Sequence, residues 1–159
     1  MTNPMSRGGR STIIRPTRET SARMRVVRQR DTKPELAVRS VLHRLGARYR
    51  VCPRNLPGSP DIANMTRRWC IFVHGCFWHG HEDCPLATVP KTNTEWWKRK
   101  VADNRARDRR KEDAVRALGF RVEVVWQCET RDETALEGRL ALFLATERKS
   151  ADRAAHRRR

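Results

Sequence analysis

Residues Trp69-Cys-Ile-Phe-Val-His-Gly-Cys-Phe-Trp-His-Gly-His-Glu-Asp-Cys84 combine an apolar run with three histidines and three cysteines. The run Cys70-Ile-Phe-Val73 has the length and the β-branched and aromatic character of a buried strand. Gly75 and Gly80 interrupt the segment after this run and predict a tight, irregular backbone there. The reactive side chains are therefore expected where a strand ends, which is a common position for chemistry because the strand is rigid and the loop is accessible.

Length and charge predict one nucleic-acid-binding domain with basic ends. The chain of 159 residues has 35 Lys and Arg against 18 Asp and Glu, a net charge of +17, and is long enough for one core. Residues 1–30 contain eight arginines against Glu19 alone, and residues 147–159 contain six basic against two acidic residues. We expect a single domain over 21–147 between basic, disordered arms at 1–20 and 148–159 that hold phosphates.

Other uses of this charge, as a solubilising tail or a basic membrane patch, are less favoured. No apolar run approaches the roughly 20 residues of a membrane span, and no signal peptide is evident. The sequence therefore predicts a cytoplasmic protein that associates with the nucleoid when it is bound to DNA.

The order of expected elements predicts an α/β fold. Thr32 and Glu35 form a capping-box pattern that starts a helix, and Gly46 ends it. Asp132 is expected to cap a last helix. The complete set is a short helix at 21–30, a helix at 32–46, strands at 48–52, 61–63, 69–73 and 120–126, and helices at 94–118 and from 132. We expect a mixed central sheet flanked by helices.

Cysteine and histidine spacing predicts a structural zinc site. Cys76, His81 and Cys84 are spaced C-x4-H-x2-C, and Cys128 is a separate fourth candidate. Three sulfur ligands and one nitrogen ligand suit tetrahedral zinc. The alternative is a set of free thiols beside an unrelated histidine. We favour zinc because this loop has too little apolar content to hold its own shape.

A second cation site is expected at Asp61, which begins the strand that pairs with the one ending at His74. A carboxylate at the start of such a strand can bind a divalent ion that also contacts a phosphate, and His74 or His79 can activate water. Each residue has a simpler interpretation. Pro-Asp is common in turns, one histidine can belong to the core, and Glu35 is already explained by the capping box.

Phe77, Trp78, Trp96 and Trp97 are large aromatic residues in otherwise polar segments. Burial is the usual fate of tryptophan, and we expect it for Trp69 and Trp126. These four aromatic residues also suit insertion between base steps, which costs less at a mispair.

Six motifs together resemble the very-short-patch repair DNA mismatch endonucleases, over about residues 21–143. They are Asp31-Thr-Lys-Pro-Glu35, Leu56-Pro-Gly-Ser-Pro-Asp61, Phe72-Val-His-Gly-Cys-Phe-Trp-His79, Thr94-Glu-Trp-Trp97, Asn104-Arg-Ala-Arg-Asp-Arg-Arg110 and Val125-Trp-Gln-Cys128. The resemblance implies a restriction-endonuclease-like fold. It also implies Mg²⁺-dependent nicking 5′ to the thymine of a T:G mispair, the product of 5-methylcytosine deamination.

The resemblance also implies a role for each matching residue. Mg²⁺ would bind Asp61 and the Val73 carbonyl; His79 would be the general base, oriented by Asp108 with Asn104; and His74 and Glu35 would support the phosphate and the hydrated metal. Zinc would bind Cys76, His81, Cys84 and Cys128. Phe77, Trp78 and Trp97 would wedge beside the mispair, while the N-terminal segment with Met24, Arg25 and Arg28 grips the opposite groove.

We expect a monomeric endonuclease that acts on mispaired double-stranded DNA, with repair proteins as possible partners. Two alternatives stay open. One is a less selective nuclease of the same fold, and the other is a non-catalytic, zinc-dependent DNA-binding module.

Overall fold

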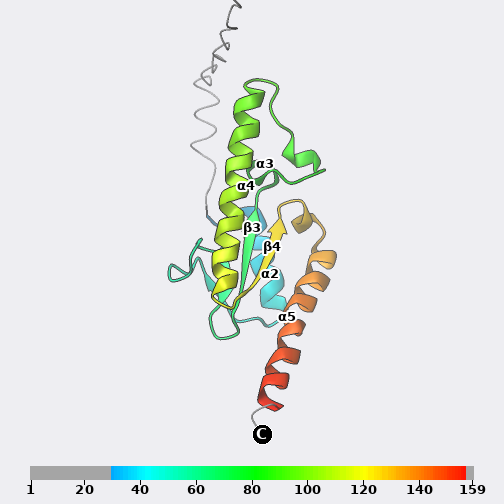
Figure 1. The fold of residues 1–159 in the computed structure, drawn as a ribbon. Coiled ribbons are helices and arrows are strands. Elements are labelled where there is room, and N and C mark those ends of the chain that lie inside the picture. Colours follow the sequence, from blue (N-terminus) through cyan, green and yellow to red (C-terminus); the bar gives the residue numbers. More distant parts are fainter. Residues whose placement is uncertain (1–29, 157–159) are drawn as a thin grey trace, which may run out of the picture.

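The computed structural model describes the backbone of residues 30–156 and the side chains of residues 30–146. It contains a four-stranded sheet in the order β1-β2-β3-β4 (Figure 1). The strands are β1 (Arg50–Val51), β2 (Ile62–Asn64), β3 (Trp69–His74) and β4 (Arg121–Trp126). Neighbours β1, β2 and β3 are antiparallel, whereas β3 and β4 are parallel. The expected mixed sheet is confirmed.

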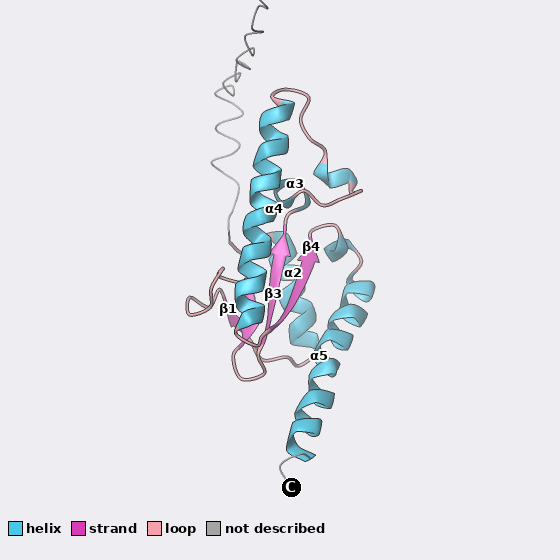
Figure 2. Cartoon of the chain, in the orientation of Figure 1, coloured by secondary structure: helices cyan, strands magenta, loops and turns pink. Residues whose placement is uncertain are grey.

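Three long helices and several short turns complete the described chain (Figure 2). They are α2 (Lys33–Arg44), α3 (Cys76–His79), the 3-10 turn Pro85–Ala87, α4 (Thr94–Ala117), the 3-10 turn Glu129–Arg131 and α5 (Glu133–His156). Figure 1 shows α4 in front of the strands and α2 behind them. No helix in the described part of the chain is long and apolar enough to cross a membrane.

Side-chain alternation along β3 creates a core on each face of the sheet. Trp69 and Ile71 point to one face, where they pack with residues of α2 and α5. Cys70 and Phe72 point to the other face, where they pack with Val115 of α4. Because successive strand residues alternate, His74 at the end of β3 lies on the α4 face.

The expected helix starts are confirmed. The hydroxyl of Thr32 accepts a hydrogen bond from the Glu35 amide at 3.5 Å, and Glu35 Oε2 accepts one from the Asp31 amide at 3.0 Å. These bonds form a variant of the capping box at the start of α2, in which the Glu35 side chain accepts from the residue before the N-cap Thr32. At α5, Asp132 Oδ1 accepts a bond from the Ala135 amide at 2.9 Å.

Three expectations differ from the structure. The strand expected at 48–52 is only two residues long and both are exposed, because it lies at the edge of the sheet. The irregular loop expected after Gly75 begins with one helical turn, α3. Helix α5 continues to His156, past residue 148 where we expected a disordered tail.

Other expectations are partly confirmed or untested. Trp69 is buried at 1% exposure, but Trp126 is half-buried. The helix expected at 21–30 lies outside the described residues, apart from its last residue. The division into one domain and two arms stays a prediction.

Candidate active site and metal-binding group

His79 and Asp108 form the closest polar pair of the site. Nδ1 of His79, the last residue of α3, lies 2.5 Å from Oδ2 of Asp108 on α4. Burial raises the pKa of Asp108, but the hydrogen bond with His79 and the charges of nearby groups outweigh it and lower the pKa below its ordinary value. The carboxylate therefore stays charged at neutral pH. It fixes the imidazole ring and leaves Nε2 as the nitrogen that faces away from this bond.

Helix α4 also fixes the backbone that carries His79. Asn104 Nδ2 donates to the Trp78 carbonyl at 2.8 Å. Gly80 ends α3 in a left-handed conformation with φ of 63°, and any Cβ there would collide with Val101 of α4. Only glycine permits both the turn and this close approach. Asn104 thus positions His79 through the backbone rather than by direct contact.

His74 stacks on His79 from the end of β3. The ring centroids are 4.2 Å apart and the planes differ by 4°. Burial, and then the charge of His79, lower the pKa of His74 to about 4. His74 is therefore neutral at physiological pH, which allows a second imidazole to lie directly against it.

Asp61 lies beside these histidines. Its Oδ2 accepts a hydrogen bond from the Val73 amide at 2.7 Å, because β2 and β3 are paired at this point. Burial raises the pKa of Asp61 to about 6, the hydrogen bond from Val73 opposes this shift, and the charge of Glu35 adds to it. A cation placed here would offset both the cost of burying the charged Asp61 carboxylate and its repulsion by Glu35.

Glu35 has both carboxylate oxygens engaged at the helix start. Thr32 Oγ1 donates to Oε1 at 2.7 Å, and the Asp31 amide donates to Oε2. The residue is only 6% exposed, yet it lines the same cavity as Asp61. Glu35 therefore both caps α2 and borders the cavity.

An open cavity of about 750 Å³ brings these groups together. Eight residues singled out from the sequence line it: Glu35, Asp61, Val73, His74, Trp78, His79, Asn104 and Asp108. These residues come from α2, β3, α3, α4 and the loop before β2. Among the expected DNA contacts, Met24, Arg25 and Arg28 lie outside the described residues.

Sequence reasoning missed five polar residues of this cavity, namely Ser59, Lys100, Arg107, Lys111 and Gln127. A signal was present for two of them. Lys100, Asn104, Asp108 and Lys111 recur at steps of four, four and three, which places them on one face of a helix. Gln127 had no such signal, because only the pairing of β4 with β3 brings it to the site.

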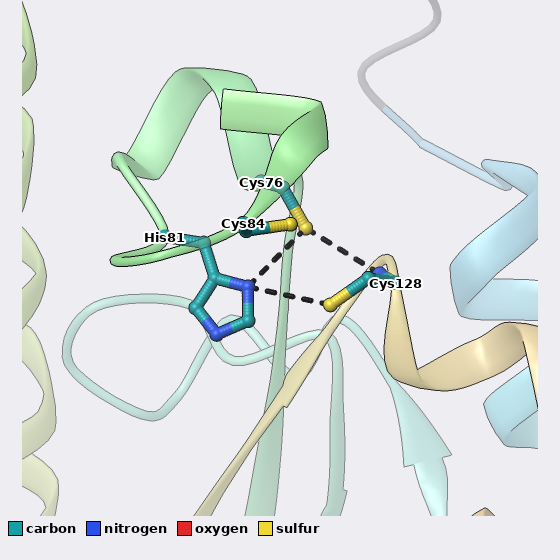
Figure 3. A group of neighbouring side chains, drawn as sticks. All are labelled: Cys76, His81, Cys84 and Cys128. Atoms are coloured by element: carbon teal, nitrogen blue, oxygen red, sulfur yellow. Dashed lines mark hydrogen bonds between the residues drawn. The ribbon is translucent and has the colours of Figure 1, made fainter. Parts of the chain in front are cut away.

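The second group of reactive side chains is Cys76, His81, Cys84 and Cys128 (Figure 3). One ligand atom from each lies within 4.8 Å of the others, so the group can hold a metal ion. Cys76, His81 and Cys84 come from α3 and the loop after it, whereas Cys128 follows β4. Burial raises the pKa of Cys76 to about 12, which a bound cation would reverse.

Trp126 joins the two groups. Its ring stacks on His81 with centroids 4.3 Å apart and planes 7° apart. It also meets His74 edge-on at 5.3 Å. The rings of His79, His74, Trp126 and His81 therefore form a continuous series from the active-site cavity to the metal-binding group.

Three expected wedge residues form an aromatic cluster above the sheet end. The ring centroid of Phe77 is 5.0 Å from that of Trp78 and 5.2 Å from that of Trp97. Trp96 contacts Trp97 from outside at 4.8 Å and is 42% exposed. The cluster joins α3 to the first turn of α4, next to the cavity that contains His79.

Comparison with known proteins identifies the family. The family model described as DNA mismatch endonuclease Vsr matches residues 14–85. The chain is 54% identical over 121 residues to the type II nicking enzyme V.XorIIP of Xanthomonas oryzae pv. oryzae, covering 76% of this chain and 88% of that protein. It is 41% identical over 136 residues to DNA mismatch endonuclease Vsr of Escherichia coli K12, covering 82% and 86%.

A third relative, the type II nicking enzyme V.NmeAIP of Neisseria meningitidis, is 38% identical over 129 residues, covering 81% of this chain and 91% of that protein. These three relatives match most of their own length as well as most of the chain. The chain therefore belongs to the Vsr family of DNA mismatch endonucleases.

Proposed function

We propose that the protein nicks one strand of duplex DNA 5′ to the thymine of a T:G mispair and so initiates very-short-patch repair. The observation that carries this proposal is the shared cavity, in which the raised-pKa carboxyl of Asp61 lies beside the bonded pair His79–Asp108. An acidic ion site next to an oriented imidazole suits hydrolysis of a phosphodiester. The aromatic cluster supports a mispair as the substrate.

In this mechanism His79 accepts the proton of the attacking water at Nε2. Asp108 holds the ring through Nδ1 and balances the positive charge that develops. His74 stays neutral and packs against the ring, so that His79 cannot rotate away. The water oxygen bonds to phosphorus as the phosphodiester bond to the leaving oxygen breaks.

Asp61 would hold Mg²⁺, together with the backbone of Val73 and, across water, Glu35. The donors are oxygens in a partly open cavity, which is the environment that Mg²⁺ prefers because it keeps several waters. When bound, the ion supplies charge that stabilises the phosphate in the transition state. The capping bonds of Glu35 support an indirect role for this residue rather than direct ligation.

Cys76, His81, Cys84 and Cys128 would hold structural zinc. A tetrahedral ion with bonds of about 2.3 Å to sulfur and about 2.05 Å to nitrogen separates these two ligand atoms by about 3.5 Å. Nδ1 of His81 lies 3.6 Å from Cys76 Sγ and 3.3 Å from Cys128 Sγ, in agreement with this geometry. All four positions are filled by protein, so the zinc would fix the α3 loop and leave hydrolysis to the other site.

The remaining parts of the proposal concern the whole molecule. We infer a restriction-endonuclease-like fold, a monomeric enzyme of the cytoplasm, and basic arms that hold the duplex. Phe77, Trp78 and Trp97 would enter the base stack at the mispair, where unstacking costs least.

A nicking assay tests this proposal. Zinc-loaded protein and Mg²⁺ are mixed with end-labelled duplexes that contain T:G, other mispairs or matched pairs in several flanking sequences. We expect a single nick 5′ to the thymine of T:G. Equal cutting of matched DNA indicates a less selective nuclease. If the wild-type protein binds the duplex without cutting it, and D61A and H79A bind it equally well, the protein is a DNA-binding module.

A further inference from the structure

Lys111 lies on the wall of the active-site cavity, and neither the capping, the metal-binding nor the proton-transfer roles described above use it. It follows Asp108 by three residues on α4, so both project from the same face of the helix. The residue is half-buried. The side chain of Lys111 therefore borders the cavity that Asp61, His79 and Asp108 also line.

The loop that carries Asp61 fixes the stem of Lys111. Gly58 adopts a left-handed conformation with φ of 74°, and a Cβ built on it would lie 2.6 Å from Lys111 Cβ and 3.0 Å from Lys111 Cγ. Any side chain at Gly58 would displace the lysine. This contact sets the direction of the lysine side chain at its base, on the wall next to Asp61.

The Lys111 ammonium has no carboxylate partner within the described residues 30–146, although Asp108 is one turn away. Its positive charge still reaches Asp108, where it is one of several charges that oppose the effect of burial. Lys98 and Arg116 of α4 are bound to Glu95 and Glu112. Lys100 and Arg107 also line the cavity, but they are not held against the Asp61 loop as Lys111 is by Gly58. A lysine on the cavity wall without such a partner is available to an anionic ligand.

We propose that Lys111 is a catalytic residue that binds a non-bridging oxygen of the scissile phosphate and stabilises the negative charge that develops there. This inference rests on the proposed function, because it assumes that a DNA phosphate enters the cavity beside Asp61. The ligand chemistry is that of a phosphodiester oxygen, which a lysine binds as a point charge. Preorganised positive charge of this kind acts mainly in the transition state.

The test compares K111M with R110M in single-turnover nicking of a T:G duplex. Methionine keeps the stem that packs on Gly58 and removes the charge. Arg110 is exposed, one position away on the same helix and absent from the cavity wall, so R110M removes an equal charge outside it. We expect K111M to lower the nicking rate by about 10²-fold, while duplex affinity changes no more than in R110M.

Sulfur substitution identifies the contact. Each non-bridging oxygen of the scissile phosphate is replaced by sulfur in turn, and the rates of wild-type protein and K111M are compared. We expect the ratio of these rates to approach one for the diastereomer whose sulfur replaces the oxygen bound by Lys111, and to stay near about 10² for the other. Equal ratios for all three substrates would indicate a structural role and overturn the proposal.

Further outcomes separate this inference from the proposed function. If wild-type protein nicks T:G duplexes and K111M does so at the same rate, the role of Lys111 is refuted and the function stands. If wild-type protein nicks nothing, the proposed function itself fails. K111Q, which also keeps an aliphatic stem, carries the same expectation and replaces K111M if that variant does not fold.

Discussion

The imidazole rings of His74 and His79 lie parallel at 4.2 Å, although one ends a strand and the other ends a helical turn. Burial keeps His74 neutral, with a pKa of about 4, so the stack involves no repulsion between two cations at neutral pH. His79 is held by this ring on one side and by Asp108 at Nδ1. The proposed general base is therefore fixed before substrate arrives.

Replacing Asp108 with asparagine tests the orientation of His79. The asparagine keeps the shape of the side chain but removes the charge that balances an imidazolium, and its amide can bind the wrong tautomer. We expect D108N to lower the single-turnover nicking rate by about 10²- to 10⁴-fold. Affinity for the mispaired duplex, measured by fluorescence anisotropy, is expected to remain as in wild type.

The matched control is D103N, an exposed aspartate on the outer side of the same helix. It removes the same charge without touching His79 and is expected to nick at the wild-type rate. A similar loss of nicking in both variants would refute the specific role of Asp108.

Replacing Asp61 with asparagine is expected to abolish nicking and to stabilise the fold. The buried carboxyl has a folded-state pKa of about 6, above its ordinary value of 3.8, so its charge opposes folding at neutral pH. Asparagine can still accept the hydrogen bond from Val73. We expect D61N to unfold in urea with a free energy about 1–3 kcal/mol higher than wild type near neutral pH without added Mg²⁺.

The size of this effect depends on pH in a defined way. The folded state binds the Asp61 proton more tightly than the unfolded state does. The contribution of Asp61 to the free energy of unfolding of the wild-type protein therefore becomes more favourable as the pH falls through about 6. The advantage of D61N should therefore shrink towards about pH 4. An advantage that is constant over this range would show that the carboxyl is not responsible.

Removal of zinc is expected to loosen the α3 loop. Metal analysis should find one zinc per chain, and a chelator should lower the free energy of unfolding by about 3 kcal/mol or more, a fraction of the roughly 10–16 kcal/mol that zinc contributes in small peptides. C128A should lose zinc to the chelator much faster than wild type. C52A is the control because Cys52 lies outside the metal-binding group; equal zinc loss in both variants would contradict the ligand set.

The aromatic cluster predicts different effects of replacing the neighbouring residues Trp96 and Trp97. Trp97 contacts Phe77 and Trp78, whereas the only aromatic ring that meets Trp96 within the described residues is Trp97. We expect W97A to lower T:G nicking by about 10- to 10²-fold, corresponding to a lost wedge worth a few kcal/mol. W96A should lose much less. Affinity for matched and mispaired duplexes is measured in parallel, and an equal loss for both would argue against a wedge.

Local sequence features were sufficient to predict the parts of the fold that depend on residues close together in the chain. The Thr32–Glu35 capping box, the cap at Asp132 and the strand ending at His74 follow from short-range patterns. So does the placement of Asp61 near His74, because a short turn pairs the strand after Asp61 with the strand that ends at His74. The hydrogen bond from the Val73 amide to Asp61 was not predicted. The spacing of Cys76, His81 and Cys84 likewise places three potential ligands within one loop.

The tertiary structure decided which distant groups meet. Cys128 joins the metal-binding group, and Gln127 the cavity, only because β4 pairs in parallel with β3. The contacts of Asp108 with His79 and of Lys111 with Gly58 depend on how α4 crosses the sheet face. Such contacts are set by packing between elements far apart in sequence, and no local pattern in one chain encodes them. The sequence thus determined the chemical groups and their local elements, while packing determined the active site they form.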